Sequence, residues 1–156
     1  MYTDKKPATP NFDRIMPQAC INAKLRRLHK LISSAYESKL KHFGLQGSML
    51  SILFIVAKHK HINQKAVADM LLLDQSTLSR DIKKLVNKSW VAIIKTKDIR
   101  HSALELTEDG YLFLEKVSPV WEKLQNTVVE ILGTYNIQQI DNISTAIQNS
   151  LEEIQT

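Results

Sequence analysis

The residues best suited to chemistry lie at the start of an expected helix that runs from Gln75 to Lys88. Amides and hydroxyls come first, and such groups can hydrogen-bond to the edges of bases. Arg80 can pair with guanine, the amide of Gln75 suits adenine, and the lysines beyond them suit phosphate oxygens. The expected nucleic-acid contacts in this helix are Gln75, Ser76, Thr77, Ser79, Arg80, Lys83 and Lys84.

Two short apolar runs after this helix predict a two-stranded ribbon. Val91–Ile94 is rich in β-branched residues and Ser102–Thr107 alternates, with the charged segment Lys95–His101 between them. A helix followed by a ribbon with a basic tip fits a DNA major groove and the minor groove beside it. A plainer role is open to Ser76 and Thr77, because hydroxyls at a helix start also serve its free N–H groups.

Charge is distributed unevenly along the 156 residues, which carry a net charge of +5. Residues 1–57 contain nine Lys/Arg and three Asp/Glu, residues 58–101 contain ten and four, and residues 102–156 contain two and nine. This pattern predicts a polyanionic partner for part of the surface. Scattered, solvated lysines are the alternative, but the second basic block coincides with the helix and ribbon described above.

The composition is that of an ordinary globular chain, 44% hydrophobic and 24% charged, and its length suits one domain with a sizeable core. No apolar run is long enough to cross a bilayer, and Met1–Pro7 lacks the apolar core of a signal peptide. The single cysteine, Cys20, can form no disulfide within the chain. We therefore expect a cytoplasmic protein.

Hydrophobic spacing predicts four helices before the ribbon. A long helix should run from Pro17 to about Gly44, with Ile21, Leu25, Leu28, Ile32 and Ala35 on one face. The next should span Gln46–His59, with Leu50, Leu53, Phe54 and Ala57 inward. Asn63 should cap Gln64–Leu71, with Ala66, Val67 and Met70 inward, and Asp74 should cap Gln75–Lys88, with Leu78, Ile82, Leu85 and Val86 inward.

Two further helices are expected after the ribbon. Thr107 should cap a long helix that passes through Pro119 with a kink and stops at Gly133, and a last helix carries Ile140, Ile143, Ile147, Leu151 and Ile154. The long helices at the two ends of the chain have more apolar surface than one small domain needs to bury, so we expect a two-fold homodimer in which these helices pack together. The expected domains are a flexible arm over residues 1–14, a helical dimerisation region over 15–44 and 108–156, and a DNA-binding module over 45–107.

This order of elements resembles the MarR family of winged helix-turn-helix transcription regulators, from about Cys20 to about Ile154. The resemblance is most specific at the Asp-x-Arg of Asp98–Arg100 and at the Leu-Thr-x-x-Gly of Leu106–Gly110. Ser89 stands where the family often has glycine, which puts the turn before the ribbon in question. The segments that carry the resemblance are 45–53, 63–71, 74–80, 98–100 and 104–110.

The resemblance implies a mainly α fold with a small β-wing, in which a winged helix-turn-helix module is flanked by long N- and C-terminal dimerisation helices. It implies that Arg100 enters the minor groove and that Asp98 orients it, with Lys97 as a further DNA contact. It also implies a homodimeric, palindrome-binding regulator, more often a repressor than an activator, released by a small aromatic acid or an oxidant. Effector-pocket candidates are Arg27, His29, Tyr36, Met49 and Trp121, although core packing or a solvated ion pair explains each one alone.

Cys20 is the candidate for oxidative sensing, because a helix N-terminus and Lys24 can activate a thiol. A small buried hydrophobic residue is the alternative reading of Cys20. The histidines around His59–His61 lack carboxylate or cysteine partners at ligand spacing, so neither metal nor cofactor is expected. Enzyme motifs are absent from the sequence. The remaining alternative is a winged-helix adaptor that binds protein without binding DNA.

Overall fold

The computed structural model describes residues 8–95 and 102–154, with side chains up to residue 150. The chain separates into two units, Met1–Ala35 and Tyr36–Thr156, which are taken here one at a time. Among the described residues, none of the helices has the length and apolar character needed to cross a membrane.

The first unit contains two short helices, α1 (Pro10–Asp13) and η1 (Pro17–Ala19), and most of α2 (Ile21–Leu40). The loose arm expected over residues 1–14 therefore includes one helical turn. Pro17 opens a separate 3-10 turn rather than the long helix, because Cys20 is extended (φ −62°, ψ 110°) and separates the two. The face predicted to point inward on this helix is exposed in the single chain at Ile21, Leu25 and Leu28.

The second unit begins with the end of α2 and a 3-10 turn, η2 (Lys41–Phe43). Gly44 caps that turn in the left-handed conformation (φ 74°), as predicted from the sequence. Helix α3 (Met49–His59) starts later than predicted, because Gly47 also has positive φ (53°) and turns the chain first. Leu50 and Leu53 are buried as predicted, together with Met49, Ile52 and Val56, whereas Phe54 and Ala57 are only half-buried.

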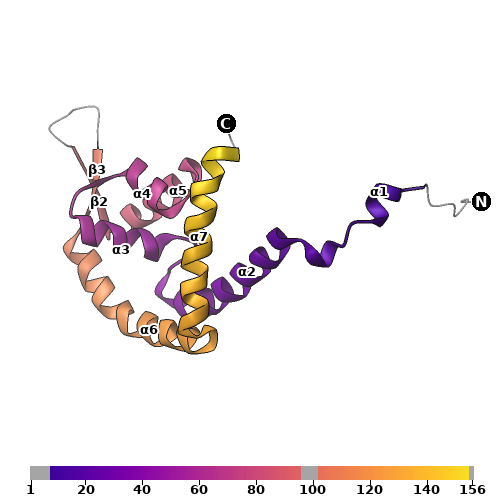
Figure 1. Cartoon of the computed structure of the whole chain (residues 1–156). Coiled ribbons are helices and arrows are strands. Elements are labelled where there is room, and N and C mark those ends of the chain that lie inside the picture. Colours follow the sequence, from indigo (N-terminus) through magenta and orange to yellow (C-terminus); the bar gives the residue numbers. More distant parts are fainter. Residues whose placement is uncertain (1–7, 96–101, 155–156) are drawn as a thin grey trace, which may run out of the picture. The chain divides into compact units, whose positions relative to one another are not determined.

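The helix-turn-helix consists of α4 (Gln64–Leu71) and α5 (Gln75–Asn87), which pack on α3 and on each other (Figure 1). Both predicted caps are confirmed. The Asn63 carboxamide oxygen accepts the Ala66 N–H at 2.8 Å, and an Asp74 carboxylate oxygen accepts the Thr77 N–H at 2.8 Å. Burial of Met70 was a wrong prediction, because Ala68 faces the core instead and Met70 is 54% exposed.

A small antiparallel sheet follows, with strands β1 (Ile62–Asn63), β2 (Val91–Lys95) and β3 (Ser102–Leu106) in the order β1-β3-β2. The predicted ribbon is therefore confirmed as β2 and β3, with Val91 opposite Leu106 and Lys95 opposite Ser102. The short strand β1 was missed, since two residues before a helix carry no alternation that a sequence could show.

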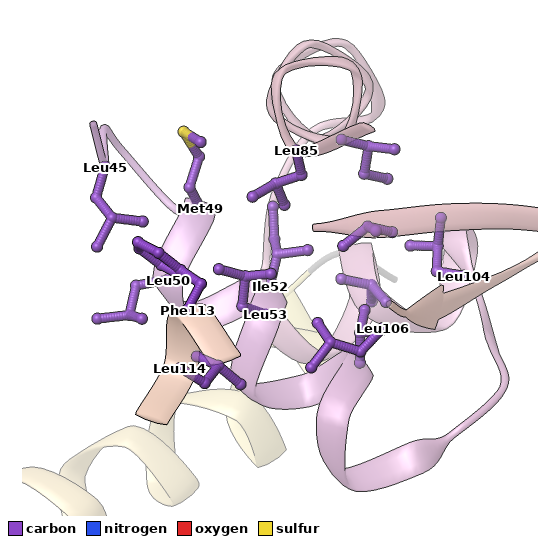
Figure 2. Close-up of a cluster of buried hydrophobic side chains, with 14 of the residues drawn as sticks. Leu45, Met49, Leu50, Ile52, Leu53, Leu85, Leu104, Leu106, Phe113 and Leu114 are labelled. Carbon is purple, nitrogen blue, oxygen red and sulfur yellow. The ribbon is translucent and has the colours of Figure 1, made fainter. Parts of the chain in front are cut away.

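The core joins α3, α5, the sheet and the start of α6 (Glu108–Leu132). Figure 2 shows Ile52 and Leu53 of α3 among Leu85, Leu104, Phe113 and Leu114. Ile52, Leu53, Leu85 and Leu104 are fully buried, so α5, the second helix of the helix-turn-helix and called the recognition helix below, is anchored to the scaffold by apolar packing along its inner side.

Helix α6 continues through Pro119, as predicted, and curves between its ends (Figure 1). Helix α7 (Thr134–Ile154) then packs against α6 but buries none of its described side chains. Ile140, Ile143 and Ile147 recur at helical spacing on α7 and are between 41% and 53% exposed. In the single chain, α7 therefore presents an uncovered apolar stripe.

Candidate nucleic-acid interface

The outer face of α5 is polar and uncovered by the rest of its unit. Its inner positions Leu78, Ile82 and Leu85 are buried, which turns the opposite side of the helix outward. Residues three, four, seven and eleven positions apart share one face of a helix. The face defined in this way is exposed throughout and consists of Ser76, Ser79, Arg80, Lys83 and Asn87.

This face brings together four of the predicted base and phosphate contacts, and Gln75 is exposed beside it. Asn87 was not singled out from the sequence, although its position eleven residues after Ser76 was available as a signal. Among the described residues, Arg80 and Lys83 take part in no ion pair, so their charges are available to a partner.

The hydroxyls of Ser76 and Thr77 are used within the helix start. Both donate to the Asp74 carboxylate, at 2.5 Å from Ser76 and 2.7 Å from Thr77. These bonds, with the N–H of Thr77, stabilise the charged carboxylate and hold the pKa of Asp74 well below its usual range. The two hydroxyls thus support the capping carboxylate rather than accept the free N–H groups of the helix, and any base contact by Ser76 or Thr77 requires a shared or broken bond.

Replacing Asp74 by alanine is expected to lower stability at neutral pH and to matter less in acid. Because the folded pKa is depressed, the stabilisation is present above the ordinary carboxyl pKa of about 4 and declines as the pH falls further. Urea denaturation of both proteins at pH 7 and at about pH 3 measures this difference. Asp74→Asn is the matched control, because asparagine caps well but does not titrate there. A gap between wild type and Asp74→Ala that stays constant down to pH 3 contradicts the expectation.

Asp81 is a buried carboxylate on the same helix that sequence reasoning did not identify. It is 5% exposed, and one oxygen, Oδ2, accepts the Ser48 hydroxyl at 2.7 Å and the Ser48 N–H at 3.3 Å. The other oxygen, Oδ1, accepts the ammonium of Lys84 at 3.0 Å. The predicted contact Lys84 is therefore already in an ion pair. A carboxylate beside the apolar positions of α5 was the signal available.

The end of α5, the wing and the start of α6 meet at one junction. Thr107 Oγ1 donates to the Ser89 carbonyl at 2.5 Å and accepts the Gly110 N–H at 3.0 Å. The Thr107 N–H donates to the Trp90 carbonyl at 3.1 Å. The junction fixes where β3 ends and α6 begins relative to the recognition helix.

Ser89, at the position where the resemblance led us to expect glycine, takes the left-handed conformation at this junction (φ 60°). The turn is a Schellman motif, in which two backbone hydrogen bonds close the helix: the Trp90 N–H donates to the Leu85 carbonyl at 3.1 Å, and the Ser89 N–H donates to the Val86 carbonyl at 2.9 Å. Serine in place of glycine therefore does not displace β2. The left-handed backbone conformation is less favourable for serine than for glycine.

The wing itself is described only along its two strands. Lys95 is exposed at the end of β2. The predicted tip contacts Lys97 and Arg100, and the predicted orienting residue Asp98, lie outside the described residues.

Comparison with known proteins tests the resemblance to the MarR family. A model of the MarR family matches residues 43–98, the part that contains α3, α4, α5 and β2. SarZ of Staphylococcus epidermidis, an HTH-type transcriptional regulator, is 27% identical over 129 residues, covering 81% of this chain and 78% of SarZ. Residues 43–98 of the chain thus match the MarR family, and its curated relatives are HTH-type transcriptional regulators. The resemblance inferred from the sequence is thereby confirmed.

Solved MarR-like structures share the fold. MOSR of Mycobacterium tuberculosis, solved in complex with DNA, has a TM-score of 0.73 at 23% identity, covering 83% of this chain and 97% of MOSR. BpsR of Bordetella bronchiseptica, whose DNA binding is regulated by 6-hydroxynicotinic acid, has a TM-score of 0.77 at 17% identity, covering 86% of this chain and 96% of BpsR. The fold is a winged helix-turn-helix, and the chain is a transcription regulator rather than an enzyme.

The effector candidates of this chain have separate structural roles. Met49 is 1% exposed within the core. The Tyr36 hydroxyl donates to the Gln125 side-chain oxygen, and partial burial raises the pKa of Tyr36. Trp121 packs edge-on against Phe54, with ring centroids 5.2 Å apart. The packing alternative therefore accounts for Met49 and Trp121.

The remaining candidates lie in the first unit of the chain, on or just before α2. His29 contacts the Ser33 hydroxyl at 3.3 Å, and Arg27 lines a shallow hollow of about 450 Å³ with Ala23, Arg26, Lys30 and Leu31. Cys20 is a free, exposed thiol, so the buried-hydrophobe alternative is wrong for the single chain. Within residues 8–95 and 102–154, no group of three His, Cys, Asp or Glu side chains is placed to hold a metal ion.

Proposed function

We propose that this MarR-family regulator reads DNA sequence with the outer face of α5. The observation that carries the proposal is the uncovered row of Ser76, Ser79, Arg80 and Lys83, with no ion pair on either cation among the described residues. Arginine pairs with guanine through two hydrogen bonds, and amides such as Gln75 pair with adenine. Lys97 and Arg100 of the wing, oriented by Asp98, are proposed to reach the minor groove.

The proposed assembly is a homodimer on a palindromic operator. The apolar stripe of Ile140, Ile143 and Ile147 on α7, and the exposed Leu25 and Leu28 on α2, support burial in a second copy. Residues 15–44 and 108–156 would form this dimerisation region and residues 45–107 the reading module. Half-sites would then lie about one helical turn apart, roughly 10 bp or a multiple.

The proposed regulatory role is repression, relieved by a signal, in the cytoplasm. BpsR, with the same fold, has its DNA binding regulated by an aromatic acid, which supports a small organic acid as the signal. The exposed thiol of Cys20 supports oxidation as a second route. Release of bound DNA by an aromatic acid in wild type, or by peroxide in wild type but not in Cys20→Ser, separates the two signals.

The test of the function is selection of duplexes from a random library, followed by fluorescence anisotropy on the selected duplex between 50 and 200 mM salt. A palindromic consensus is expected, with affinity that falls by orders of magnitude over this range because bound counterions are released. Light scattering on the complex should give two protein chains per duplex. A protein-binding adaptor predicts no enriched sequence and no salt-dependent binding, and that result would overturn the proposal.

A further inference from the structure

Asp81 occupies an unusual place for a carboxylate. It projects from the recognition helix α5 toward the first turn of α3, where Gly47 and Ser48 form the bend before the helix. A Cβ atom at Gly47 would lie 3.2 Å from Asp81 Oδ2, so the bend is closely fitted to this oxygen. The N-terminus of a helix also favours a negative charge.

The side chain of Ser48 hydrogen-bonds to Asp81 rather than capping its own helix. It occupies the N-cap position of α3, yet its side chain makes no capping bond there and donates its hydroxyl to Asp81 instead. A buried carboxylate without donors is costly, and these two bonds from Ser48 satisfy Oδ2. The interaction ties α5 to α3 at a defined rotation about the α5 axis, in addition to the apolar packing.

The second oxygen of Asp81 distinguishes two adjacent lysines. Lys84 is paired with Oδ1 at 3.0 Å, with its side chain 46% exposed and that of Asp81 only 7% exposed. Lys83 is exposed and lies seven residues after Ser76, in the middle of the outer face. Lys84 lies at the edge of that face, on the side of Asp81. The two lysines therefore present different net charge to a duplex.

We propose that Asp81 is a positioning residue for DNA recognition, which ties α5 to Ser48 and holds Lys84 in an ion pair, so that Lys83 alone of the two lysines neutralises a phosphate. This inference rests on the proposed DNA-binding function. It predicts that the non-specific affinity for DNA is lower than the number of lysines on the recognition helix suggests, because Asp81 already neutralises the charge of Lys84.

The test uses the salt dependence of binding by full-length variants to the duplex selected with wild type. Each phosphate contact contributes about 0.9 to the slope of log affinity against log salt. Lys83→Met should lower the slope by about this amount, and Lys84→Met, its matched neighbour, should leave the slope unchanged. Equal slope losses for both variants would overturn the proposal, as would an unchanged slope for Lys83→Met.

Asp81→Asn supplies the decisive arm, because asparagine can still accept the Ser48 hydroxyl but no longer compensates Lys84. The slope should steepen by up to about 0.9, equivalent to about a 3.5-fold larger loss of affinity between 50 and 200 mM salt. Adding Lys84→Met to Asp81→Asn should restore the wild-type slope. A merely structural role for Asp81 predicts an unchanged slope in both variants and contradicts the proposal. If wild type itself binds no duplex, the proposed function fails before this comparison is reached.

Folding provides a readout that needs no DNA. Urea denaturation should show coupling between Asp81→Asn and Lys84→Met, so that their effects on the unfolding midpoint are not additive. Asp81→Asn and Lys83→Met should be additive. Additivity in both pairs would show that the Asp81–Lys84 ion pair is not formed in solution, and would overturn the proposal even where DNA binding is intact.

Discussion

Gly110→Ala is expected to lower the free energy of unfolding by about 3 kcal/mol, at the upper end of what overpacking costs. A Cβ atom at this position would lie 2.2 Å from the carbonyl oxygen of Trp90 and 2.8 Å from a side-chain carbon of Leu106. The first contact is with backbone, which cannot rotate away as a side chain can. The junction would have to open, and the bond between Thr107 N–H and Trp90 O would be strained or lost.

Thermal unfolding followed by circular dichroism measures this effect, and a fall in Tm of about 6–12 °C is expected for a chain of this size. Asp109→Ala is the control in the same helical turn. Asp109 is exposed, and its loss removes only a favourable charge at the helix start, about 0.3–1 kcal/mol. If the two variants lose the same stability, close packing at Gly110 is not the reason for the glycine.

Arg80→Ala is expected to weaken binding to the selected duplex by about 10- to 100-fold, which corresponds to about 1–3 kcal/mol for a lost bidentate base contact. Arg80 is exposed on the outer face of α5 and pairs with no described residue, so its removal should leave the fold unchanged. Fluorescence anisotropy at one fixed salt concentration gives the affinity, and light scattering checks that the oligomeric state is retained.

Arg80→Lys separates charge from geometry. Lysine keeps the positive charge but lacks the planar fork that meets guanine through two bonds. If Arg80 reads a base, the lysine variant should lose affinity for the selected duplex and discriminate less against a duplex changed at that base pair. If lysine binds with wild-type affinity and specificity, Arg80 contacts phosphate and must be removed from the base-reading set.

Much of this architecture was predictable, for reasons visible in particular residues. Asn63, Asp74 and Thr107 each precede a helix and have side chains that accept its free N–H groups, so these three helix starts were correctly placed. Gly44 marked the end of the 3-10 turn η2 that follows α2, because glycine adopts the left-handed conformation easily. Local chemistry of this kind needs no knowledge of the rest of the chain.

Other features depend on contacts between distant residues. The pairing of Asp81 with Ser48 joins positions 33 residues apart, and nothing in either local pattern reveals it. Met70 fits the apolar spacing of α4 but is exposed, whereas Ala68, two residues earlier, is buried. The closeness of Lys84 to Asp81 was readable as a helical spacing, but its meaning depended on Asp81 being buried, which only the packing of α5 on α3 decides.

The junction at Thr107 fixes one end of α6 to the recognition helix and leaves its other end far away. The residue that caps the first turn of α6, Thr107, is bonded to Ser89 just after the recognition helix, whereas α6 is 25 residues long and its last residue lies at most about 36 Å away along the axis. A rotation of about 10° at the first turn corresponds to about 6 Å of travel at the far end. A displacement of a few ångströms at the far end of α6 would thus reach the recognition helix as a rotation of only a few degrees.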